Sequence, residues 1–148
     1  MYRRFDFEGE IHAKLACVPL VVRRKLDLSA LKISLAGWQS LSREERLALC
    51  HLPVDTAPDI AVYREVLQGF AARAGVALSP LEPADPATWT AAAVALRLRD
   101  RLGDDAPGEA FAAALDEEER YALVKLAEPK REVSKLRAAL AELGHHTP

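Results

Sequence analysis

The segment LSREERLALCHL, residues 41–52, returns as LDEEERYALVKL at residues 115–126, and this pair decides the fold. Seven of the twelve aligned positions are identical: three leucines, two glutamates, an arginine and an alanine. These residue types are all common in helices, so a chance likeness between two amphipathic helices is the alternative. The interpretation that we favour is an internal duplication, with two related helical units packed about a pseudo-twofold axis.

The first residues of both segments form capping boxes, which begin helices. Ser42 in one segment and Asp116 in the other are expected to accept the third helical N–H, while Glu45 and Glu119 reach back to the cap N–H. A proline follows each segment within a few residues and ends its helix. The carboxylates of both segments are therefore explained as helix starts rather than as acid and base catalysts.

The rest of the chain also reads as helices. Proline, glycine and cap residues predict about seven in all, and the alternation of Leu31, Ile33 and Leu35 with polar residues predicts a short extended connection. The predicted fold class is all-α, a compact bundle with two related halves. Beyond the two segments above, the expected helices span 19–28, 56–74, 86–102 and 130–143.

The predicted domain organisation is a single helical domain over residues 1–148. Its internal halves cover about 1–75 and 85–148, and the proline-containing segment 76–84 joins them. A chain of 148 residues is long enough to bury a core without a metal or a disulfide.

Composition limits the compartment and the class of partner. The net charge of −2 and the interspersed acids argue against nucleic acid, and the longest uncharged apolar stretch, Ala87 to Leu96, is too short for a membrane span. Cys17 and Cys50 lie among apolar residues, so both are expected to be buried thiols in a reducing compartment. The sequence predicts a cytoplasmic protein.

Catalytic and metal-binding patterns give no positive signal. The chain has no nucleophile elbow, phosphate-binding glycine loop or zinc-ligand spacing, and adjacent Cys50 and His51 would point about 100° apart on a helix. We therefore expect no catalytic residues, no metal and no cofactor. An enzyme is therefore the weaker hypothesis, and it would require a deep pocket that holds convergent titratable groups.

The segment CVPLVVRRKLD, residues 17–27, resembles the signature of the nitrate-reductase-associated protein family. Trp38, Leu52-Pro53 and Tyr63-Arg64 follow in the family's order, and ALVKL at 122–126 resembles its second motif. Genes of this family lie near nitrate reductase and molybdenum-cofactor genes. The resemblance implies a role in nitrate assimilation, with nitrate reductase or a molybdenum-cofactor enzyme as partner.

Two functional hypotheses follow. The first is a non-catalytic accessory or assembly protein that acts by protein–protein interaction through Arg23, Lys25, Asp27 and Trp38, with a homodimer left open. The second is a regulatory domain that binds a small anion or a pterin between the halves. Its cationic donors would be Arg23, Arg46, Arg120 and Lys125. The signature could equally be structural, with its apolar residues in the core.

Overall fold

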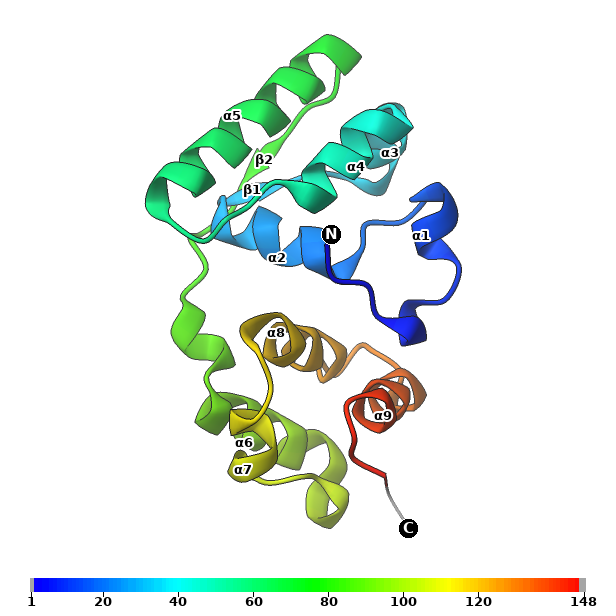
Figure 1. Ribbon diagram of the computed structural model, residues 1–148, viewed down its shortest axis with the longest axis vertical. Coiled ribbons are helices and arrows are strands. Elements are labelled where there is room, and N and C mark those ends of the chain that lie inside the picture. The colour runs from blue at the N-terminus through cyan, green and yellow to red at the C-terminus, as the bar shows by residue number, and fades with distance from the viewer. Residues whose placement is uncertain (1, 147–148) are drawn as a thin grey trace. The chain divides into compact units, whose positions relative to one another are not determined.

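Helices make up nearly all of the regular structure. The computed structural model describes residues 2–146 and has within them nine α-helices, three short 3-10 helices and one two-stranded sheet (Figure 1). The all-α prediction is confirmed. None of the helices within 2–146 has the length and apolarity that crossing a bilayer requires. The α-helices are α1 (Ile11–Lys14), α2 (Leu20–Leu28), α3 (Leu35–Ser40), α4 (Arg43–His51), α5 (Ala57–Ala74), α6 (Ala91–Leu102), α7 (Glu109–Ala113), α8 (Glu117–Leu126) and α9 (Val133–Glu142).

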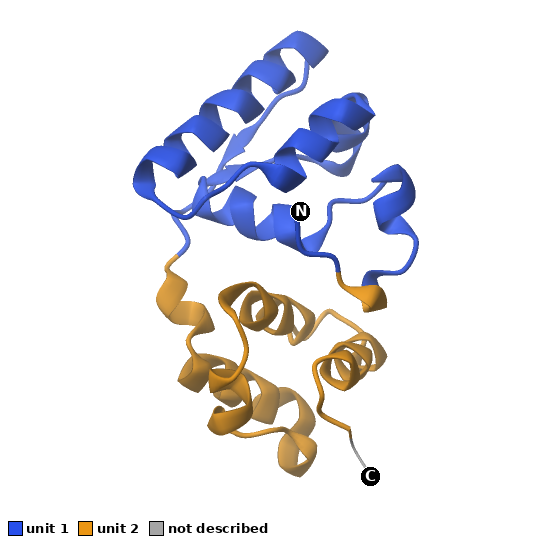
Figure 2. Cartoon of the chain, viewed as in Figure 1, with its two compact units in different colours: residues 1–4, 8–84 blue, residues 5–7, 85–148 orange. Residues whose placement is uncertain are grey.

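The chain folds into two compact units, which Figure 2 colours separately. Unit 1 contains the residues up to Arg4 and Glu8–Ala84, and unit 2 contains Phe5–Phe7 together with the residues from Asp85 onward. The chain therefore leaves unit 1 for three residues near its start and returns to it. The 3-10 helix η1 (Asp6–Glu8) lies at this crossing.

The proline-containing segment 76–84 belongs to unit 1. Its residues Ser79–Pro80 form strand β2, which pairs antiparallel with β1 (Leu31–Lys32). In addition, the Leu81 N–H donates to the Ala30 carbonyl at 2.9 Å. This segment was expected to join the halves, but these bonds attach most of it to unit 1.

Two short helices, α3 and α7, lie where the sequence predicted no helix. The predicted extended connection ends at β1, because Ser34 begins α3 by accepting the Gly37 N–H at 3.0 Å. Leu35, which alternation placed in an extended segment, is therefore the first helical residue. Helix α7 follows the N-cap Gly108 and covers only five residues.

Cap residues fix the longer helices. The capping boxes of α4 and α8 are both present as predicted, and α5 begins with a third box made by Thr56 and Asp59. The predicted helix 86–102 is divided, because Thr90 caps a new helix by accepting the Ala93 N–H. The first residues of the predicted helix form only the 3-10 helix η2 (Pro86–Trp89), which precedes α6. Another 3-10 helix, η3 (Gly103–Asp105), follows α6.

Buried aromatic side chains with satisfied polar atoms lie at the centre of each unit. In unit 1, Tyr63 is fully buried and its hydroxyl donates to the Leu49 carbonyl at 2.8 Å. In unit 2, the rings of Trp89 and Tyr121 meet edge to face at 5.1 Å, and the Trp89 indole N–H donates to Glu117 at 2.8 Å. Each core therefore packs aromatic surface without leaving these polar groups unpaired.

Several elements of the two units recur 74 residues apart. Leu35 and Glu109 begin α3 and α7, and Arg43 and Glu117 begin α4 and α8. Leu49 and Leu123 are both fully buried. These correspondences are what a duplication would produce; the packing of the halves about a pseudo-twofold axis stays a prediction.

Candidate functional site

Arg46 and Trp38, two of the predicted interaction residues, converge on one main-chain carbonyl in unit 1. The Trp38 indole N–H donates to the Leu15 carbonyl oxygen at 2.7 Å, and Arg46 donates to the same oxygen at 2.8 Å. Arg46 also donates to the carbonyls of Lys14 and Ser42. Trp38 is fully buried, so its indole holds the fold of unit 1 and does not lie on its surface.

The carbonyl that these two side chains share belongs to an unusual residue. Leu15 has a positive φ of 54°, a conformation that side-chain-bearing residues adopt only where their surroundings enforce it. The side chain of Leu15 is fully buried, and its carbonyl accepts the two hydrogen bonds described above. Together these contacts fix the turn before α2.

Arg120 repeats this arrangement in unit 2. Its Nε donates to the Trp89 carbonyl at 3.0 Å, and its Nη1 donates to the Leu115 carbonyl. Arg46 and Arg120 lie 74 residues apart, and so do their acceptors Leu15 and Trp89. Both arginines therefore fasten the capping-box helix to the segment before the first long helix of their unit.

Lys25, predicted as a recognition residue, is buried at 6% exposure in unit 1. Its ammonium donates to the carbonyls of Cys50 and Leu52, each at 2.6 Å, at the C-terminal end of α4. A cation is favourable there because helix C-termini carry partial negative charge and unpaired carbonyls. The side chain of Lys25 is thus part of the helix end, not of the surface.

The remaining predicted residues are more accessible and belong to different units. Arg23 is exposed on α2, and Asp27 is half-buried on the same helix. Lys125 lies in unit 2, where its ammonium is 3.7 Å from Glu128 and 5.6 Å from the centre of the Tyr121 ring. Five of the seven predicted residues are in unit 1, and two are in unit 2.

The two cysteines differ, which corrects the expectation that both are buried. Cys50 is fully buried, and this burial raises the pKa of its thiol from 9.0 to about 11, although the nearby Lys25 charge opposes the shift. Cys17 is exposed, because it lies in the bend before Pro19, outside helix α2. Neighbouring apolar residues in the sequence do not determine burial in a turn.

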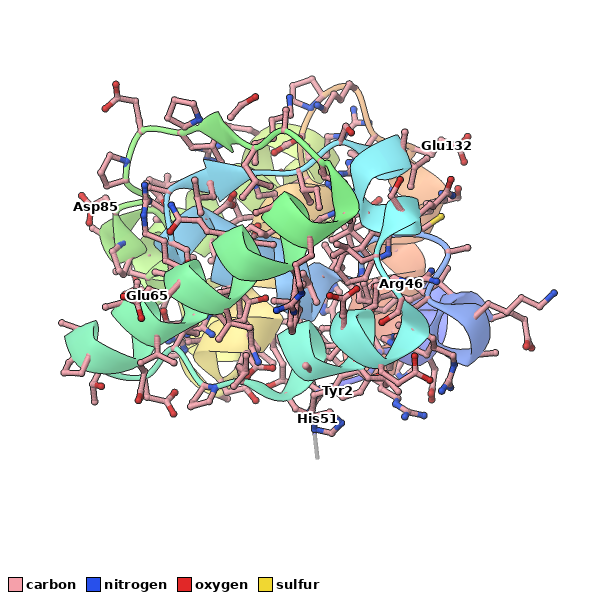
Figure 3. All side chains as sticks on the ribbon, turned by 90° about the horizontal axis from the view of Figure 1, so that it is seen from above. Tyr2, Arg46, His51, Glu65, Asp85 and Glu132 are labelled. Carbon is pink, nitrogen blue, oxygen red and sulfur yellow. The ribbon has the colours of Figure 1, made fainter. Side chains whose placement is uncertain are left out.

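A polar cluster near the N-terminus of unit 1 was not predicted. The Tyr2 hydroxyl lies 3.3 Å from His12 Nδ1, and His12 Nε2 lies 3.2 Å from a Glu8 carboxylate oxygen. The other Glu8 oxygen accepts the Leu20 N–H at 3.0 Å. The His51 ring meets the Tyr2 ring edge to face at 5.0 Å, and Figure 3 shows these two side chains together.

The chemistry of this cluster is that of a hydrogen-bonded chain. Burial is the main reason that the pKa of Tyr2 is raised, and the neighbouring Cys50 adds to the shift. The phenol therefore keeps its proton near neutral pH, and its O–H can donate to His12 Nδ1 in the tautomer whose Nε2–H donates to Glu8. The cluster ties the N-terminal segment to α2; within the described residues, no three His, Cys, Asp or Glu side chains converge as metal ligands would. The four-residue spacing of Glu8 and His12 was the only signal for it in the sequence.

An open groove of about 480 Å³ lies in unit 2, between α6 and the segment 103–109. Its apolar lining comes from alanines together with Leu96 and Pro107, and Arg99, Asp104 and Glu109 bring charge to it. Leu96 is 65% exposed although it lies in the middle of a helix. Sequence analysis did not select these residues, because an apolar residue on a helix is normally assigned to the core.

Comparison with known proteins identifies the family of the chain from a sequence pattern. No curated protein and no solved structure matches the chain. The pattern of the conserved nitrate reductase-associated proteins, in contrast, matches residues 4–143, which includes both units almost completely. The resemblance first seen in residues 17–27 thus extends along nearly the whole sequence, and the chain belongs to the conserved nitrate reductase-associated protein family.

Proposed function

We propose that this protein is a non-catalytic accessory or assembly factor that binds nitrate reductase and acts by protein–protein interaction. The observation that carries the proposal is the family match over residues 4–143, since the family is named for an association with nitrate reductase. A protein that serves an enzyme in this way needs a surface that the enzyme recognises, and it needs no reaction centre of its own.

The positions of the reactive side chains support this proposal. Glu45 and Glu119 bond back to the main chain at the starts of α4 and α8, and bonding to the Ser42 N–H is the main cause that lowers the pKa of Glu45. Burial makes the Cys50 thiol a poor nucleophile because the thiolate is the reactive form. These groups stabilise the fold.

The anion-binding alternative gains no comparable support. It requires Arg46 and Arg120 as cationic donors, but both direct N–H groups to main-chain carbonyls of their own units. An anion would have to compete with those bonds. We therefore favour the interaction with a protein partner.

Co-purification tests the proposed function. A tagged copy of this protein, expressed at its native level in nitrate-grown cells, should recover nitrate reductase, and the same tag on an unrelated protein of similar size is the control. Measuring molybdenum in the recovered enzyme separates two roles: an assembly factor should bind mainly the metal-free form, whereas a permanent subunit should bind the mature form. Repeated recovery of no nitrate reductase in either form would refute the proposal.

A further inference from the structure

We draw no further inference here: the strongest candidate, the open groove of about 480 Å³ between α6 and the segment 103–109 of unit 2, is an apolar surface for which nothing within the described residues 2–146 shows what covers it.

Discussion

Lys25 illustrates how the meaning of a charged residue depends on contacts distant in the sequence. From the sequence, Arg23, Lys25 and Asp27 could form a recognition surface, and nothing within residues 17–27 separates them. What distinguishes them is a contact with α4, about 25 residues later in the sequence. Of the three side chains, only Lys25 donates to the carbonyls at the C-terminal end of that helix. Residue 23 faces solvent and residue 25 closes a helix end. This part of the candidate site could not be predicted, because it depends on how two helices pack.

Replacing Lys25 with methionine should therefore destabilise the protein strongly. Two buried carbonyls would lose a charged donor, and a loss of about 2–4 kcal/mol in the free energy of unfolding is expected. Arg23→Met is the control on the same helix and should change stability by no more than about 0.5 kcal/mol. Urea denaturation measures both. Similar losses in the two variants would show that the buried bonds of Lys25 do not stabilise the fold.

The raised pKa of the Cys50 thiol predicts how the stability of the protein depends on pH. This pKa rises from 9.0 in an unfolded chain to about 11 in the folded protein. Below pH 9 the thiol is protonated in both states and has no effect. Between pH 9 and 11 only the unfolded chain releases the proton, so the folded state loses stability relative to it, by about 1 kcal/mol at pH 10.

The matched variant for this measurement is Cys50→Val, because valine stands at the corresponding place in α8, Val124. The difference in stability between the two proteins should shift in favour of the variant as the pH rises from 8 to 10. Burial, the main cause that raises the pKa of Tyr63, acts in both proteins, and only the smaller effect of the Cys50 charge on Tyr63 is absent from the variant. A difference that stays constant over this range would contradict the account of the thiol.

At the scale of elements, the sequence was most informative where a helix begins. The capping boxes of α4 and α8 and the cap at Thr56 could be read directly, because each depends on residues three positions apart. Helix α3 was missed because its cap, Ser34, follows a pattern of alternating apolar residues that favours a strand. The division at Thr90 was missed because the segment 86–102 is rich in helix-forming residues throughout, which hides a cap within it.

The arginine of each capping-box helix should matter equally in the two units. Arg46→Met and Arg120→Met should each lower the free energy of unfolding by about 1–3 kcal/mol, since each removes donors from partly buried carbonyls. Lysine at either place should restore only part of the loss, because one ammonium cannot reproduce the forked geometry of a guanidinium. Arg97→Met, on the exposed side of α6, is the control.

Thermal and urea denaturation of these variants bear on the duplication hypothesis. A large effect at Arg46 and none at Arg120 would mean that the likeness of residues 41–52 and 115–126 is one of sequence only. Equal effects would be expected of two units that inherited the same anchoring contact.

At the scale of the whole molecule, the arrangement of the chain in two units was only partly visible in the sequence. The sequence predicted two halves joined by 76–84, and nothing in it indicated that Phe5–Phe7 belong to unit 2. Their place in unit 2 depends on Phe5, which is 2% exposed, and on the Phe7 N–H, which donates to Glu142 on α9 at 2.9 Å. Two phenylalanines among charges near an N-terminus carry no sign of a partner that far along the chain.

Phe5→Ala should consequently loosen unit 2 rather than unit 1. The loss of a buried aromatic side chain should cost about 3–5 kcal/mol, and amide exchange should accelerate first in α8 and α9. Phe7→Ala, which removes a less buried ring, should have a smaller effect. If amide exchange accelerated first in α4 and α5, Phe5 would stabilise unit 1, and its assignment to unit 2 would be wrong.

The crossing of the chain at residues 5–7 has a consequence for biosynthesis. Phe7 and Glu142 are separated by 135 positions, so Phe7 bonds to a residue that the ribosome adds 135 residues later. Domains made early in translation usually fold while the rest of the chain is still being made. Unit 2 cannot be completed in this way: until α9 has been translated, Phe5–Phe7 lack the partners that will enclose them.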